Sequence, residues 1–263
     1  MQDDLKGQVT RSAAEIYEEF FVPALFWQWA PVMADAVGIK AGQRVLDVAC
    51  GTGAAAREAA SRDALVTGLD RNEGMLALAR RIAPSVEWKA GRAEQLPFTD
   101  GSFDAVVSQF GLMFFDDRPQ ALREMWRVLK PGGRLAVAVW DRLESSPGYA
   151  AMAALLKRLF GRRIAGELHA PFALGDPDAL RDLFSQAGIG DPKVTAHAGT
   201  ARFPSIESWV RTDVKGWTLA DLIDDEQYGL LLREAAVALR SYSRADGIVM
   251  FDAPALIVTA TRA

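Results

Sequence analysis

Between residues 43 and 140, short runs of apolar and β-branched residues alternate with segments of helical periodicity. Strands are expected at 44–50, 64–70, 85–91, 103–110 and 134–140, and helices at 54–62, 73–83 and 119–129. Strands that alternate with helices form a parallel sheet whose crossover helices cover its faces. The chain is therefore expected to fold as an α/β protein.

After residue 141 the pattern is less regular. It predicts helices near 147–160 and 176–187, a loop that contains Pro171, and a strand near 192–200. Residues 205–244 look mainly helical, and 247–261 looks like a strand. The organisation expected is one domain over 1–263, with a helical lid at 1–40, a core at 43–140 and a helical cap insertion at 202–245.

The composition excludes several classes of protein. One cysteine cannot form an internal disulfide, and with only two histidines it leaves too few ligands for a structural zinc site, so we expect no metal. A net charge of −4 without a basic block argues against nucleic acid as a partner. The acidic start of the chain lacks a secretory signal pattern, which favours a cytoplasmic protein.

One uncharged stretch, residues 20–34, raises the question of a membrane segment. It is shorter than the roughly 20 apolar residues that a spanning helix requires, and it contains Pro23, Gln28 and Pro31. We expect no integral membrane segment and interpret the stretch as buried or as covering a ligand.

The residues after the first predicted strand point to a nucleoside ligand. Gly51 and Gly53 would allow a ligand to approach the backbone, and Asp70 would end the second strand, where it can accept hydrogen bonds from ribose hydroxyls. The glycines alone also fit a dinucleotide-binding loop. Asp47 favours a ligand without phosphate, because its charge would oppose a pyrophosphate at the helix N-terminus. S-adenosylmethionine fits, since it carries an adenosine, a sulfonium and an ammonium.

Four ordered segments extend this pattern: VLDVACGTG, GLDRNEGML, AGRAEQLPFTDGSFDAVVSQFGLMFF and ALREMWRVLKPGGRLAVAVW. Residues 43–140 thereby resemble the core of class I S-adenosylmethionine-dependent methyltransferases, in the style of the ubiquinone/menaquinone C-methyltransferase-like (methyltransferase type 11) group. The resemblance implies a Rossmann-like, seven-stranded, mostly parallel sheet of order 3-2-1-4-5-7-6, with strand 7 antiparallel.

The resemblance also implies a set of cofactor-binding residues. These are Asp47 and the backbone of Ala49 and Gly51 around the methionine moiety, with Gly53 in the same loop, Asp70 on the ribose, Arg71 and Met75 beside the adenine, Ala93 and Glu94 at the adenine edge, and Gln109 and Phe110 near the sulfonium.

Two sequence features bear on the methyl acceptor: a motif that is missing after strand 4, and a group of aromatic residues near the N-terminus. Methyltransferases that act on base amines or glutamine amides share an Asn/Asp-Pro-Pro-Tyr run after strand 4, whereas residues 108–111 here are Ser-Gln-Phe-Gly, which disfavours that subclass. Four aromatic residues near the N-terminus could contact the acceptor or simply pack in the core: Tyr17, Phe20, Phe26 and Trp29.

Several other polar residues have a structural interpretation beside a chemical one. Asp116 and Asp117 could be metal ligands, but an aspartate before Arg118-Pro119 is typical of a helix cap. His169 is a weak candidate for a general base, while His197 is expected to be structural. We interpret Cys50 as a packed residue of the loop.

The function predicted is transfer of a methyl group from S-adenosylmethionine to a small, apolar or aromatic acceptor by in-line displacement, which leaves S-adenosylhomocysteine. Two alternatives from other classes stay open: an NAD-dependent oxidoreductase on a similar fold, and a non-catalytic S-adenosylmethionine-binding interaction module. A variant of the main hypothesis acts at a membrane surface on a quinone or lipid.

Overall fold

The structure is a computed structural model that describes residues 11–215, 219 and 222–263. Its strands are β1 (Arg44–Val48), β2 (Leu65–Asp70), β3 (Glu87–Ala90), β4 (Phe103–Gln109), β5 (Leu129–Trp140), β6 (Lys193–His197), β7 (Thr200–Phe203), β8 (Val249–Asp252) and β9 (Ala255–Thr261). Seven form one sheet in the order β3-β2-β1-β4-β5-β9-β6, and β7 pairs with β8 in a second sheet. Only β9 runs antiparallel to its neighbours in the large sheet, so the predicted α/β class and strand order are confirmed.

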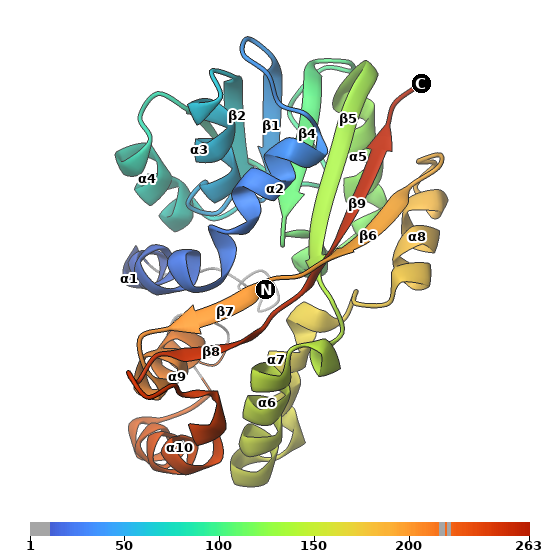
Figure 1. Cartoon of the computed structure of the whole chain (residues 1–263). Helices are drawn as coiled ribbons and strands as arrows, with labels where there is room; N and C mark the ends of the chain where they lie inside the picture. The colour runs from blue at the N-terminus through green and yellow to red at the C-terminus, as the bar shows by residue number, and fades with distance from the viewer. Residues whose placement is uncertain (1–10, 216–218, 220–221) are drawn as a thin grey trace.

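The helices flank the large sheet and build a second layer beyond its lower edge (Figure 1). They are α1 (Arg11–Ile16), the π-helical η1 (Tyr17–Phe26), α2 (Trp29–Ala36), α3 (Ala54–Ser61), α4 (Glu73–Ile82), α5 (Arg118–Val128), α6 (Pro147–Phe160), α7 (Arg162–His169), α8 (Pro177–Gln186), α9 (Ile206–Lys215) and α10 (Asp225–Ala238), with short 3-10 turns at Leu112–Phe114, Leu143–Ser145, Ala170–Phe172 and Arg240–Tyr242. Helix α2 crosses in front of the large sheet and α5 lies behind it. The carboxyl ends of the parallel strands face this second layer, here called the cap, which consists of α6, α7, α9, α10 and the small sheet of β7 and β8.

Two boundaries differ from the sequence-based expectation. Residues 130–133 were predicted as a turn before a strand, but they belong to β5, because Gly132 and Gly133 exchange backbone hydrogen bonds with Arg262. The loop predicted to contain Pro171 follows a helix, α7, that the sequence pattern did not predict. Helix α7 forms there because Ile164 and Leu168 bury one face of it.

The two C-terminal strands expected at 192–200 and 247–261 are each split. The first strand divides into β6, which pairs in the large sheet, and β7, which pairs in the small sheet. The second divides into β8 of the small sheet and β9 of the large sheet. Pro254 lacks a backbone N–H, and Gly199 lies against the indole of Trp29, so the ladder breaks at this crossing. The small sheet continues away from the large one beside α9 (Figure 1).

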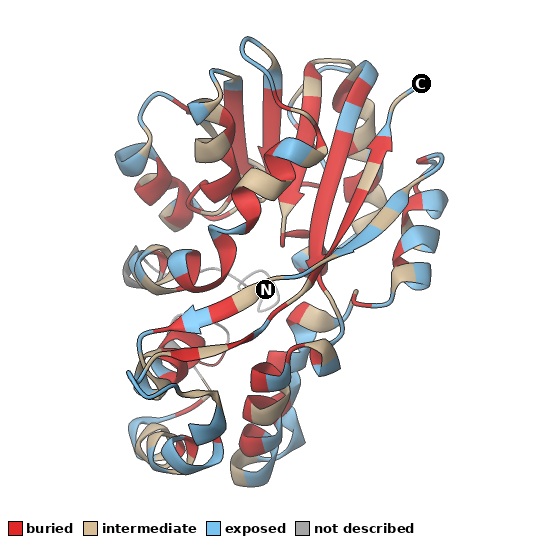
Figure 2. Cartoon of the chain, viewed as in Figure 1, coloured by how far each residue is buried: buried red, intermediate tan, exposed pale blue. Residues whose placement is uncertain are grey.

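Buried residues run without interruption from the central strands into the cap (Figure 2). The uncharged stretch 20–34 contributes Phe21, Leu25 and Trp29 to this core, all of them almost fully buried. No helix in the described part of the chain is long and apolar enough to cross a membrane.

Candidate functional site

The loop that follows β1 adopts a backbone conformation that ordinary residues rarely reach. Ala49, Gly51 and Gly53 all have positive φ, at 58°, 56° and 88°. Asp70 at the end of β2 holds this loop, because its carboxylate accepts the N–H of Gly51 and that of Asn72, each at 2.8 Å. Burial raises the pKa of Asp70, and these backbone bonds oppose the rise.

Asp47 lies beneath the same loop and is almost completely buried. Its Oδ2 accepts the N–H of Ala56 at 3.0 Å, in the first turn of α3, while its Oδ1 has no hydrogen-bond partner. Burial raises the pKa of Asp47 to about 8, against the effect of the Ala56 bond and with a further contribution from the charge of Asp70. A buried oxygen without a partner is costly, which marks this carboxylate as a candidate for ligand contact.

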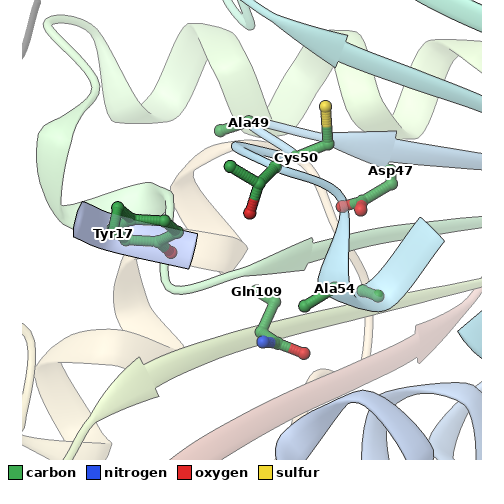
Figure 3. Close-up of a pocket in the computed structure, with 8 residues that line it drawn as sticks. Tyr17, Asp47, Ala49, Cys50, Ala54 and Gln109 are labelled. Atoms are coloured by element: carbon green, nitrogen blue, oxygen red, sulfur yellow. The ribbon is translucent and has the colours of Figure 1, made fainter. Parts of the chain in front are cut away.

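A small cavity of about 20 Å³ lies between this loop and the N-terminal segment (Figure 3). Its lining residues are Tyr17, Asp47, Ala49, Cys50, Thr52, Ala54, Ala55 and Gln109. Thr52 Oγ1 and Gln109 Oε1 are buried without a hydrogen-bond partner, as is Asp47 Oδ1. Burial and the neighbouring Asp70 raise the pKa of Tyr17 well above its ordinary value. Tyr17 is therefore a neutral phenol over a cluster of unsatisfied acceptors.

The residues predicted to surround an adenine lie beside one another after β2 and β3. Asp116 links them, because its carboxylate pairs with Arg71 at 3.6 Å and its N–H donates to Glu94 Oε1 at 3.0 Å. Met75 is buried at the start of α4, and Ala93 is buried near Glu94. The structure thus brings the predicted adenine side together next to Asp70.

An aromatic cluster extends from Tyr17, which lines the cavity. Phe110, which has a φ of 57°, stacks on Trp140 with ring centroids 3.9 Å apart. Phe26 lies 5.6 Å from Phe110, and Tyr17 stacks on Phe26 at 5.3 Å. Trp29 meets Phe110 edge-on at 5.8 Å. Three of the four predicted acceptor residues therefore belong to one cluster.

The other candidates lie elsewhere. Phe20 is half-buried under the guanidinium of Arg211, 5.6 Å away, toward α9. His169 is exposed at the end of α7 and does not line the cavity, and His197 ends β6. Asp117 accepts the N–H of Gln120 at 2.9 Å, so its predicted role as a helix cap is confirmed.

Sequence analysis did not single out three residues that matter here. Thr52 lies between Gly51 and Gly53 in the glycine motif, so the motif could have pointed to it. Asn72 caps α4 through bonds to Gly74 and Met75, a pattern that an Asn before a helical segment suggests. Trp88 gave no local signal: its indole lies against Gly53 and Gly68, where a Cβ would come within 2.4 Å of the ring.

The possible metal ligands among the described residues are not clustered. Within the part of the chain that the structure describes, no group of three or more His, Cys, Asp or Glu side chains is placed to hold one. Cys50 is a buried free thiol that lines the cavity, and burial raises its pKa further.

Comparison with known proteins shows which family the chain resembles. Residues 46–137 match the family model described as a methyltransferase domain. The chain is 48% identical over 120 residues to a demethylmenaquinone methyltransferase of Renibacterium salmoninarum, covering 46% of this chain and 51% of that protein. It is 40% identical over 171 residues to the demethylmenaquinone methyltransferase of Mycolicibacterium paratuberculosis, covering 62% of this chain and 70% of that protein. The chain belongs to the class I S-adenosylmethionine-dependent methyltransferases.

The similarity in sequence covers only part of the chain, whereas the similarity in fold covers most of it. The chain spans about half the length of the first relatives it matches. The match to a solved structure of a putative methyltransferase from Anabaena variabilis covers 89% of this chain and 96% of that one, with a TM-score of 0.67 and 18% sequence identity. At that identity, the likeness concerns the fold.

Proposed function

We propose that this protein transfers a methyl group from S-adenosylmethionine to a small, apolar or aromatic acceptor. The observation that carries the proposal is the buried, unsatisfied Oδ1 of Asp47 beneath a glycine loop that Asp70 anchors. The names of its relatives, which are methyltransferases, support the same chemistry.

The residues around the cavity fit the chemical groups of this cofactor. Asp47 Oδ1 would accept a hydrogen bond from the ammonium of the methionine moiety, and the positive charge of that ammonium would favour the ionised carboxylate. A pyrophosphate in the same place would oppose ionisation of Asp47 and is disfavoured. Asp70 would bind the ribose, since a carboxylate oxygen that already accepts one N–H can accept a further hydroxyl. Arg71, Met75 and the Ala93–Glu94 segment would flank the adenine.

When bound, the cofactor supplies an activated methyl group on a sulfonium. The task left to the protein is to align the acceptor and to exclude water, and orientation alone can lower a barrier by about 7–11 kcal/mol. The rings of Tyr17, Phe26 and Phe110 would cover the reacting atoms on the acceptor side. The proposed reaction does not depend on His169, the weak candidate for a general base, because its side chain is exposed at the end of α7.

Binding of the cofactor would require the N-terminal segment to move. A cavity of about 20 Å³ accommodates little more than one water molecule. Tyr17 lies over the loop, so closely that a Cβ on Gly51 would be 3.8 Å from its ring. We infer that α1 and η1 open to admit the cofactor and close over it.

A quinol is a specific candidate for the acceptor. Curated relatives carry the name demethylmenaquinone methyltransferase. The buried, stacked rings of Phe110 and Trp140 lie next to Gln109, which lines the cavity, so a flat acceptor ring there would have aromatic neighbours.

The experiment that tests the proposed function follows radiolabel from the methyl group of S-adenosylmethionine. The purified protein is incubated with a panel of phenols, naphthols and quinols, and products are separated from the donor. We expect label in at least one aromatic acceptor and formation of S-adenosylhomocysteine in equal amount. Tight binding of S-adenosylhomocysteine without any transfer would instead favour a non-catalytic binding module.

A further inference from the structure

One side chain connects the residues around the cavity with the segment that covers them. Gln109 is the last residue of β4, and its Nε2 donates a hydrogen bond to the backbone carbonyl of Phe26 at 3.1 Å. Phe26 is the last residue of η1 and lies 83 positions earlier in the chain. The bond therefore joins the large sheet to the segment that has to open when the cofactor enters.

The other end of the same amide is unused. Gln109 lines the cavity (Figure 3), and its Oε1 is buried without a hydrogen-bond partner among the described residues. A buried carbonyl oxygen without a donor is costly. The bond to Phe26 fixes the orientation of the amide, because exchanging its two ends would set Oε1 against another carbonyl oxygen. Gln109 thus holds an acceptor in place for a donor that the described residues do not supply.

Three oxygen atoms of the cavity-lining residues are unused in this way. They are Asp47 Oδ1, Thr52 Oγ1 and Gln109 Oε1, and each is buried without a partner in the part of the chain that the structure describes. All three can accept a hydrogen bond, and an ammonium group has three N–H donors and no acceptor. The cavity of about 20 Å³ has room for one group of the size of water, which is also the size of an ammonium. The methionine moiety of the proposed donor carries such a group.

The packing around Phe26 makes its bond to Gln109 depend on the position of η1. The Phe26 ring stacks on Tyr17 at 5.3 Å and lies 5.6 Å from the ring of Phe110, which follows Gln109 in the chain. If η1 moves away from β4, the ring and the carbonyl of Phe26 leave together and the amide of Gln109 becomes free. A ligand that orders this amide therefore favours closure, because coupling between two sites is reciprocal.

We propose that Gln109 couples closure of η1 to the methionine moiety of the donor: its Oε1 accepts a hydrogen bond from the donor's ammonium while its Nε2 holds the Phe26 carbonyl. The inference rests on the proposed function, because it concerns the cofactor of the same methyl transfer. It adds that η1 closes over the intact donor and not over an adenosine fragment that lacks the ammonium. Gln109 is then a determinant of closure, in a role separate from that of the residues around the adenosine.

The test compares two ligands that share the adenosine part. S-adenosylhomocysteine carries the ammonium, whereas 5′-methylthioadenosine lacks the whole amino-acid tail. Each is added at saturating concentration to the full chain, and hydrogen exchange of residues 17–26 is measured by mass spectrometry. We expect exchange to be about tenfold slower with S-adenosylhomocysteine than with 5′-methylthioadenosine, the effect of one hydrogen bond to a charged group.

Gln109→Met assigns this difference to the amide, because methionine has a similar length but neither the donor nor the acceptor. With this variant, exchange of residues 17–26 should be the same with either ligand. Its affinity for S-adenosylhomocysteine, measured by calorimetry, should fall about tenfold, while its affinity for 5′-methylthioadenosine should change by less than about twofold. Gln186→Met, a change at an exposed glutamine of α8, is the matched control and should behave as the wild type.

Each result decides the matter. Equal exchange of residues 17–26 with the two ligands in the wild-type protein overturns the inference, so a failure of Gln109→Met to fold does not protect it. A difference that persists in the folded variant, or an equal loss of affinity for the two ligands, also overturns it. Failure of the wild-type protein to bind S-adenosylhomocysteine would instead contradict the proposed function, which keeps the two claims separate.

Discussion

Asp47 and Asp70 stand close together at the ends of neighbouring strands, yet their oxygens are used differently. Both oxygens of Asp70 accept backbone N–H groups, so this residue shapes the loop as well as offering acceptors to a ligand. Only one oxygen of Asp47 is occupied. Sequence alone could place both residues, because strand ends and glycine motifs are local patterns. It could not show which oxygen is free, since that depends on the approach of α3.

The raised pKa of Asp47 predicts how stability changes with pH. An aspartate with a pKa near 3.8 when unfolded and about 8 when folded holds a proton in the folded state that it loses on unfolding. Over that range the folded state binds more protons, so this residue's effect on the free energy of unfolding becomes less favourable as pH rises from about 4 toward 8.

Asp47→Asn removes that dependence and keeps an oxygen to accept the Ala56 N–H. We expect the variant to gain stability relative to the wild type as pH increases, measured by urea unfolding at pH 5, 6, 7 and 8. Burial also raises the pKa of Asp213 to about 8, but its contribution is common to both proteins and cancels in the difference. A difference that stays constant, or falls, with increasing pH would contradict the assignment.

At the scale of elements, the glycine loop serves two purposes. Its positive φ values shape the binding loop, and its lack of side chains leaves room for Trp88, whose indole donates to the Ala83 carbonyl at 2.9 Å. The loop's shape follows from a local motif. The packing of Trp88 joins residues of β3 to a loop more than 30 positions earlier, and no local pattern reports such a contact.

A comparison of Gly53→Ala with Gly42→Ala distinguishes the strain of a positive φ from the contact with Trp88. Both glycines have positive φ, so both substitutions incur strain of roughly 1–2 kcal/mol. Only at Gly53 would the new Cβ collide with Trp88, at 2.2 Å, and overpacking adds roughly 1–3 kcal/mol. We expect Gly53→Ala to lower the free energy of unfolding by that additional amount in urea titrations. Equal losses in the two variants would show that Trp88 does not constrain the loop.

In the whole molecule, the core and the cap meet where the two C-terminal hairpin strands cross α2. Gln28 bonds to the backbone of Thr200 in both directions, at 2.7 and 3.0 Å, and Gly199 lies against Trp29. Sequence analysis predicted strands in both regions, but not that each would divide between two sheets. The division depends on contacts between residues about 170 positions apart, which periodicity cannot reveal.

Gly199→Ala tests the importance of this junction. A Cβ there would lie 2.2 Å from the Trp29 ring and 2.6 Å from the Ala253 carbonyl oxygen, so the strands must separate from α2. We expect faster hydrogen exchange in β7, β8 and α9, measured by mass spectrometry, with β1–β4 unchanged. Gly190→Ala, where nothing lies within 4 Å, is the matched control. Unaltered exchange in the cap of the Gly199 variant would show that the junction does not hold it.

The central claim is that the loop between β1 and α3, together with Asp70, binds a methyl donor and no dinucleotide. The most direct measurement is a calorimetric titration of S-adenosylhomocysteine and of NAD into the wild-type protein and into Asp70→Ala. We predict one molecule of S-adenosylhomocysteine bound per chain, no binding of NAD, and a loss of about 1.5–3 kcal/mol in binding free energy for each charge-assisted hydrogen bond that the variant removes. Binding of NAD in place of S-adenosylhomocysteine, or equal affinity of S-adenosylhomocysteine for the two proteins, would contradict the account.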